Sequence, residues 1–133
     1  MKLVMIFIAT LFMFNAIADE SMLKESQYKY VAQSIGKGKP YFLEVGSDSC
    51  YSCQIMGRML YKVVQKHPEY NIHFINVKKE RYAAYTLQIR MIPTQIIYDK
   101  NGTEVYRHIG ILSSAKLRAL LKTLVTLRGN QKR

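Results

Sequence analysis

Two cysteines, Cys50 and Cys53, are the residues of this 133-residue chain whose type and spacing most directly suggest chemistry. They are the only cysteines in the sequence, and two residues separate them. A thiolate at Cys50 can attack a disulfide, and Cys53 can then resolve the mixed disulfide by attacking Cys50. The pair opens an expected helix, residues 50–66, where unpaired N–H groups and the helix dipole lower the pKa of Cys50 below the free value of about 8.5. Asp48 opposes this effect if its carboxylate lies close.

The cysteine pair also allows two structural interpretations. A disulfide between residues three apart closes a very small loop, so it removes little entropy from the unfolded chain. Cys50 and Cys53 followed by His67 and His73 fall within the loose spacing of a zinc finger. A zinc finger needs a short hairpin around its cysteines, whereas these cysteines open a long helix that ends at Pro68. His73 falls in a strand pattern, so zinc would have to bridge distant parts of the domain.

A copper site is a further alternative for the same thiols. Met56 or Met59 would complete it, since thiolate and thioether ligands suit copper. Both methionines also fit the apolar stripe of the expected helix, which gives them an ordinary role in the core. Dithiol–disulfide exchange needs no bound cofactor beyond the redox-active pair itself, so we expect neither cofactor nor metal.

The elements that position the cysteines follow from the apolar patterns. Stripes at three- and four-residue spacing predict helices, and short apolar runs predict buried strands. Asn101-Gly102 is typical of a hairpin turn. The expected helices are residues 21–35 with Ser21 as N-cap, 50–66, 80–88 and a last one capped by Ser113 or Ser114 and running to 127; the expected strands are 41–45, 72–77, 95–98 and 103–109. This order predicts an α/β domain with a mixed four-stranded sheet flanked by helices on both faces.

The N-terminal residues 1–18 have the pattern of a secretory signal peptide. Lys2 precedes an apolar run, residues 3–14, and the small-x-small sequence Ala16-Ile17-Ala18 follows. The alternative is an uncleaved membrane anchor, but a spanning helix usually needs about 20 apolar residues. We therefore expect residues 19–133 to form one exported domain.

The charge balance is strongly basic, with 20 Lys and Arg against nine Asp and Glu and a net charge of +11. Such a charge attracts nucleic acid, anionic surfaces or acidic partners. Export argues against nucleic acid, and the bases are scattered along the chain. We expect most of them to be solvated, with a binding surface for an anionic partner as the alternative.

Three segments resemble the thioredoxin family. Residues 43–53 look like its strand, loop and active-site turn, residues 89–94 (Ile-Arg-Met-Ile-Pro-Thr) look like the loop that bears its cis-proline, and Gly102 and Gly110 fall where the family has its hairpin and a glycine before the last helix. The resemblance implies a thioredoxin-like fold. It departs in Ser49, where the family has tryptophan, and in the absence of an evident first strand.

The resemblance also assigns roles. Pro93 is expected to be cis beside the cysteines, and the Ile92 backbone to pair with extended substrates. Tyr51 and Ser52 replace the family's Gly-Pro between the cysteines, so they alter the redox balance and face the substrate. Glu44, where related thioredoxins carry Asp, has two interpretations. It is an exposed strand residue, or a buried carboxyl of raised pKa that moves protons to and from Cys53.

Together these features predict an exported, periplasmic thiol–disulfide oxidoreductase, a monomer, that acts on protein thiols and disulfides. Its small single-domain build favours a reductant, for example one that keeps cysteines of periplasmic proteins or apocytochromes free. A membrane redox protein would recharge it. The alternatives are a non-catalytic binding module on the same fold and a copper or zinc carrier.

Overall fold

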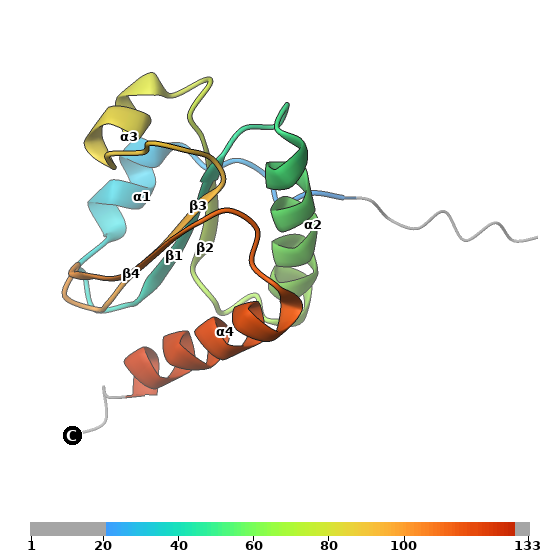
Figure 1. The fold of residues 1–133 in the computed structure, drawn as a ribbon. Coiled ribbons are helices and arrows are strands. Elements are labelled where there is room, and N and C mark those ends of the chain that lie inside the picture. Colours follow the sequence, from blue (N-terminus) through green and yellow to red (C-terminus); the bar gives the residue numbers. More distant parts are fainter. Residues whose placement is uncertain (1–20, 130–133) are drawn as a thin grey trace, which may run out of the picture.

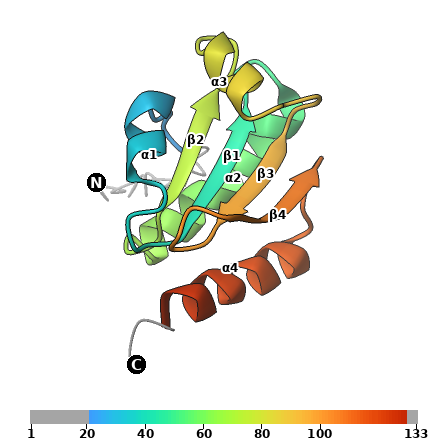
Figure 2. The ribbon, with the colours of Figure 1, turned by 90° about the vertical axis from the view of Figure 1, so that its left-hand side faces the viewer.

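The computed structural model describes residues 21–129, which form one mixed sheet with helices on both faces (Figures 1 and 2). The elements are α1 (Tyr28–Ser34), β1 (Tyr41–Gly46), α2 (Tyr51–Lys66), β2 (Ile72–Asn76), α3 (Arg81–Thr86), β3 (Thr94–Tyr98), β4 (Glu104–Ile109) and α4 (Ser114–Gly129). The strand order is β2-β1-β3-β4. β1 and β2 are parallel, while β3 is antiparallel to both β1 and β4. This confirms the predicted architecture.

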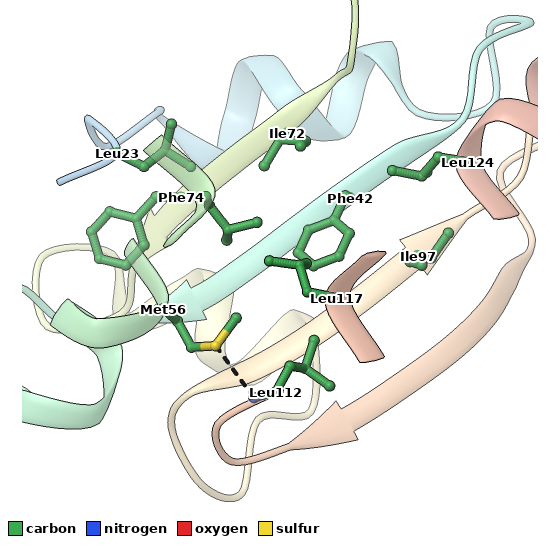
Figure 3. Packing of buried hydrophobic residues seen from close by; sticks show 10 residues of the cluster. Leu23, Phe42, Met56, Ile72, Phe74, Ile97, Leu112, Leu117 and Leu124 are labelled. Carbon is green, nitrogen blue, oxygen red and sulfur yellow. Dashed lines mark hydrogen bonds between the residues drawn. The ribbon is translucent and has the colours of Figure 1, made fainter. Parts of the chain in front are cut away.

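Two apolar clusters fill the spaces between the sheet and its helices. β1 is buried along its whole length, as its continuous apolar pattern predicts. One cluster joins alternate residues of the strands to α2 and α4 (Figure 3), and the other joins the remaining strand residues to α1 and α3. The first contains Leu23, Phe42, Met56, Leu60, Ile72, Phe74, Ile97, Leu112, Leu117 and Leu124. The second contains Tyr28, Val31, Tyr41, Leu43, Val45, Ile75, Ala83, Leu87 and Ile96.

The first helix is shorter than the sequence predicts. The expected range was 21–35 with Ser21 as N-cap, whereas α1 begins at Tyr28. The backbone N–H of Tyr28 donates to both carboxylate oxygens of Glu80, at 3.0 and 3.1 Å. A side chain distant in the sequence therefore caps this helix, and Ser21 does not. No local pattern reveals such a cap.

The residues before α1 are extended and lie along β2. Glu25 forms a parallel bridge with Phe74, and the N–H of Ser26 donates to the Phe74 carbonyl at 2.8 Å. The N–H of Leu23 donates to the Gly57 carbonyl of α2 at 3.0 Å. Glu25 thus forms one β-bridge beside β2, in a segment where the sequence predicts no strand.

The β3–β4 hairpin forms as predicted but through a longer loop than the two-residue Asn-Gly type. The N–H of Asp99 donates to the Thr103 carbonyl at 2.9 Å, and the N–H of Gly102 donates to the Asp99 carbonyl at 3.1 Å. Gly102 has φ +85°, which favours glycine, whereas Asn101 has no positive φ. The Asp99 carboxylate also accepts from the N–H groups of Asn101 and Thr103. Asp99 therefore organises the turn.

The expected signal peptide, residues 1–18, lies outside the described residues. Among residues 21–129, no helix is both long and apolar enough to span a membrane.

Candidate functional site

The cysteine pair lies at the start of α2, as the sequence predicts. Cys50 is the N-cap residue and is half-buried, whereas Cys53 is completely buried. The two form a disulfide with Cα atoms 5.1 Å apart. The N–H of Cys53 donates to the Cys50 sulfur at 3.3 Å. In the reduced protein the same N–H favours a thiolate at Cys50, because a helix N-terminus stabilises negative charge.

Gly46 makes room for Cys53. It is the last residue of β1, although the sequence placed it in the following loop. A Cβ atom at position 46 would lie 2.8 Å from the Cys53 sulfur and 3.0 Å from its Cβ. The inner cysteine therefore packs directly on backbone, and any larger residue at 46 would displace it. The sequence feature that indicates this packing is an apolar strand that ends in glycine just before the cysteines.

The loop before Cys50 is held by side chains. The Ser47 hydroxyl accepts from the N–H of Ser49 at 3.2 Å and lies 3.0 Å from the Ser49 hydroxyl. Lys78, which follows β2, donates from Nζ to the Ser49 hydroxyl at 2.5 Å. A positive charge thus lies next to the residue that precedes Cys50.

Asp48, two residues before Cys50, is a partnered anion. A hydrogen bond from Asn76 is the main cause that lowers the pKa of Asp48, and the charges of Lys79 and Lys78 act in the same direction. The Asp48 carbonyl accepts from the Gln54 side chain of α2 at 2.7 Å. Its charge is therefore compensated on the β2 side of the loop.

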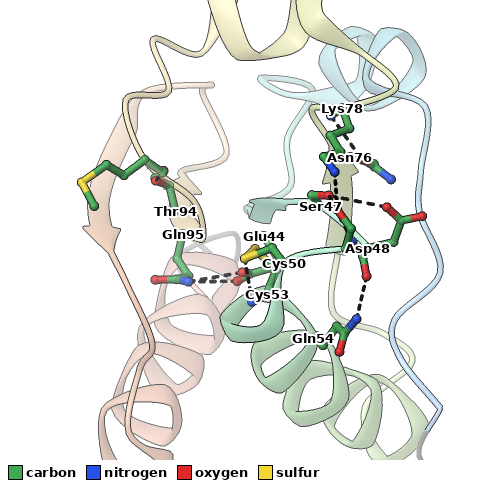
Figure 4. Close-up of a disulfide and its surroundings, with 12 residues drawn as sticks. Glu44, Ser47, Asp48, Cys50, Cys53, Gln54, Asn76, Lys78, Thr94 and Gln95 are labelled. Atoms are coloured by element: carbon green, nitrogen blue, oxygen red, sulfur yellow. Dashed lines mark hydrogen bonds between the residues drawn. A yellow bond between two sulfur atoms is a disulfide. The ribbon is translucent and has the colours of Figure 1, made fainter.

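Glu44 is completely buried, which excludes the exposed interpretation. It lies in β1 on the face covered by α2, two residues before Gly46. Burial raises the pKa of Glu44 to about 8, while a hydrogen bond from Gln95 acts in the opposite direction. Figure 4 shows its carboxyl meeting the Gln95 amide, and Gly46, which packs on Cys53, lies on the same face of β1. This placement suits proton exchange with Cys53, and that role stays a prediction.

Gln95 and His108 extend this polar cluster, and sequence reasoning missed both. The Gln95 amide Nε2 donates to Glu44 Oε2 at 3.1 Å, with Oε1 at 3.4 Å. The Gln95 Oε1 lies 2.8 Å from Nδ1 of His108 on β4. The sequence feature that could have indicated them is Gln95, a second polar residue in a strand expected to be buried. A buried polar group needs a hydrogen-bond partner, so Gln95 and Glu44 could have been expected to pair.

Pro93 is cis, as the resemblance implies. It immediately precedes β3, and the register pairs Thr94 with Val45, so Pro93 lies at the end of the sheet where β1 leads to the cysteines. Pro93 is buried and Ile92 is half-buried. The neighbouring Met91 is 63% exposed. The end of the sheet thus presents backbone and an apolar side chain at its surface.

Tyr51 and Ser52 form the first turn of α2 between the cysteines. Tyr51 is 74% exposed, and Ser52 is half-buried. An aromatic ring therefore projects next to Cys50, where an approaching substrate can contact it.

The histidines of the zinc-finger interpretation lie apart from the cysteines. His67 is the C-cap of α2, about 25 Å along the helix axis from Cys50 at 1.5 Å per residue. It stacks on Tyr70, while the His73 ring stacks on Tyr41. Among residues 21–129, no three His, Cys, Asp or Glu residues form a group that could hold a metal ion.

Met56, a ligand of the copper alternative, is completely buried in the core. Its sulfur accepts from the N–H of Leu112 at 3.3 Å (Figure 3). Met59 packs against the same cluster. Both methionines therefore have the core role that their spacing predicts.

Comparison with known proteins agrees with this geometry. A family model described as a thioredoxin-like domain matches residues 28–124. No protein with a curated description matches the sequence. Among solved structures, oxidised mitochondrial thioredoxin 3 from Saccharomyces cerevisiae is 18% identical with a TM-score of 0.62, covering 76% of this chain and 94% of that one. Malassezia sympodialis thioredoxin is 22% identical with a TM-score of 0.63, covering 74% and 88%. These structures share the fold.

Proposed function

Because the chain belongs to the thioredoxin-like domain family, we propose that it is a thiol–disulfide oxidoreductase acting on protein substrates. The observation that carries the proposal is the arrangement of the two sulfurs. Cys50 is the half-buried N-cap of α2, and Cys53 is buried beneath it against Gly46. One sulfur is therefore accessible to a substrate, and the other can reach only its partner.

The reaction follows from this difference in access. In the reducing direction, the Cys50 thiolate attacks a substrate disulfide, forms a mixed disulfide and releases one substrate thiolate. Cys53 then loses its proton to Glu44 and attacks the Cys50 sulfur. The bond between Cys50 and the substrate breaks, and its electron pair leaves with the second substrate sulfur. Both substrate sulfurs leave as thiolates, of which one can take the proton back from Glu44 and the other is protonated by solvent. The Cys50–Cys53 disulfide results, so two electrons pass from the enzyme to the substrate.

Substrate would bind across the surface around the pair. The Ile92 backbone, before cis-Pro93, suits pairing with an extended peptide. Tyr51 offers an exposed ring beside Cys50, and Ser52 lies in the same turn. These four residues form the proposed substrate surface, and the reaction needs no cofactor beyond the cysteine pair.

We place this enzyme in the periplasm as a reductant. The support is the signal-peptide pattern of residues 1–18 and, for the direction, the small single-domain build. Its substrates would be cysteines of periplasmic proteins or apocytochromes, and a membrane redox protein would recharge it.

The test is to trap the mixed disulfide. A Cys53→Ser variant cannot resolve, so it should accumulate disulfide adducts through Cys50 in cells. The matched Cys50→Ser variant should form none, because the remaining sulfur is buried. Absence of adducts from the Cys53→Ser variant would contradict the exchange function.

The direction is tested by the reduction potential of the pair, measured by thiol trapping in dithiothreitol buffers. A value near about −270 mV marks a reductant, and one near about −120 mV marks an oxidant.

A non-catalytic binding module is the second candidate, and one observation favours it. Every charged residue of α2 and α4 is basic: Arg58, Lys62 and Lys66 on α2, and Lys116, Arg118, Lys122 and Arg128 on α4. Basic helices of this kind suit an acidic partner. Under this candidate, the Cys50→Ser variant keeps its partner and its phenotype in cells, whereas the enzyme loses turnover.

A further inference from the structure

Three side chains from adjacent strands form one polar row beneath α2. The register pairs Glu44 of β1 with Gln95 of β3, and Gln95 with His108 of β4. Cross-strand partners project from the same face of a sheet. Glu44 and Gln95 are completely buried, whereas His108 at the sheet edge is half-buried. The row therefore leads from the cysteine site towards the molecular surface.

The hydrogen bonds along the row have a direction. A glutamine amide has one end that donates and one that accepts. Here Nε2 of Gln95 faces Glu44, and Oε1 faces Nδ1 of His108. An N–H at Nδ1 of His108 donates to Oε1, which holds the amide with its N–H group towards Glu44. When Glu44 is ionised, the reversed amide would place its oxygen against the carboxylate, where two acceptors would face each other, so the orientation that His108 sets favours the ionised form.

We propose that Gln95 and His108 are positioning residues for the exchange reaction: His108 orients the Gln95 amide, and the amide holds Glu44 as the acceptor of the Cys53 proton. The inference rests on the proposed function, since it concerns the resolving step. There the Cys53 S–H bond breaks and its proton goes to Glu44. The electron pair of the Cys53 sulfur forms the new bond to the Cys50 sulfur. The bond between Cys50 and the substrate sulfur breaks, and the substrate sulfur leaves with its electron pair.

The surroundings of Glu44 explain why the amide matters. Burial raises the pKa of Glu44 to about 8, and the Gln95 hydrogen bond is the contribution that lowers it. On this side of the sheet, Cys53 comes from α2 and His108 reaches Glu44 through the amide. Tyr61, Tyr70 and Tyr106 pack against the same apolar cluster, and β2 presents Phe74 at the position paired with Glu44. Without the oriented amide, Glu44 holds its proton to higher pH and cannot accept another.

The experiment follows the two phases in which reduced protein reacts with an aromatic disulfide that releases a coloured thiolate. The first phase reports attack by Cys50, and the second reports resolution by Cys53. We expect Gln95→Leu and His108→Leu to move the pH midpoint of the second phase upward. The second phase slows about tenfold at pH 7, as expected for loss of a hydrogen bond to a charged group, while the first phase is unchanged. His108→Asn should restore the wild-type profile, because Asn places an N–H donor near the position of Nδ1.

The matched control is His73→Leu. His73 is also a half-buried strand histidine, but its Nδ1 contacts the Ser26 hydroxyl, outside the row. The inference is overturned if Gln95→Leu and His108→Leu keep the wild-type midpoint, or if His73→Leu shifts it equally. If His108→Leu does not fold, Gln95→Leu still tests the inference through its shifted midpoint, and His108→Asn through its wild-type midpoint. A wild-type protein without a second phase would instead refute the proposed function.

Discussion

Replacing Glu44 by glutamine should make the stability of the protein less dependent on pH. Glutamine keeps the shape of the side chain and removes its charge. The folded protein disfavours the carboxylate at this position, because burial raises the pKa from 4.5 to about 8. Glu44→Gln should therefore stabilise the protein most where the wild-type residue is ionised.

The magnitude follows from the two pKa values. An acid whose pKa is raised by folding contributes its full stability below the unfolded value of 4.5 and loses it as pH rises through 8. A difference of about 3.5 pH units corresponds to about 5 kcal/mol above pH 8, and to about 3 kcal/mol at pH 7. The wild type should lose stability relative to the variant by these amounts between pH 4.5 and pH 8.

The assay is urea unfolding of both oxidised proteins from pH 5 to pH 9, comparing the free energy of unfolding at each pH. Oxidised protein is used because the disulfide keeps the thiols from titrating. All other ionisable groups are the same in the two proteins, so the difference between the curves isolates position 44. Curves that run parallel over this range would refute the assignment of a raised pKa to Glu44.

Glu104→Gln is the matched control. Its hydrogen bond with Arg107 lowers the pKa of Glu104, the opposite shift from that of Glu44. The residue is ionised in both folded and unfolded protein above pH 6, so the difference between Glu104→Gln and wild type should be constant from pH 6 to pH 9. A slope equal to that of Glu44→Gln would mean that the effect is not specific to the buried site.

Three further substitutions test the packing that supports the site. Gly46→Ala should destabilise the oxidised protein by about 1–3 kcal/mol in urea unfolding, because the added methyl group overpacks on Cys53. Gly129→Ala, where the added methyl group meets open space, should change stability by less than about 0.5 kcal/mol. Equal effects of the two substitutions would contradict the steric argument. Asp99→Ala should cost about 1–2 kcal/mol in thermal unfolding, because two backbone N–H groups of the hairpin loop lose their acceptor, and an unchanged Tm would contradict this. Phe42→Ala should cost about 3–5 kcal/mol in urea unfolding by leaving a cavity in the core, and a loss below 1 kcal/mol would mean that the core collapses into it.

The strands and the cysteine helix could be predicted because local pattern and tertiary role coincide there. The apolar run of β1 is buried, and the stripe of α2 packs on the sheet. The start of α2 at the cysteines also follows from sequence, since Cys50 lies where loop gives way to helix. The cis bond at Pro93 needed the resemblance, because most X-Pro bonds in folded proteins are trans.

Features made by distant segments could not be predicted. The start of α1 depends on Glu80, which follows Tyr28 by 52 positions. The pairing of Gln95 with Glu44 and with His108 depends on strand register across three strands. A single polar residue in a strand signals that a partner exists but does not identify it. These contacts lie in the tertiary structure, beyond the reach of local periodicity.

The extended residues before α1 also bear on how copies of this protein meet. Unpaired strand edges invite other chains to add to a sheet, and proteins protect them with cover or charge. Here Glu25 and Ser26 cover part of the outer edge of β2, and β4 carries the Glu104–Arg107 ion pair. A chain shortened to begin at residue 27 would leave the backbone of β2 open at that point. Such a truncation should favour edge-to-edge association and aggregation, even though it removes no residue of the cysteine site.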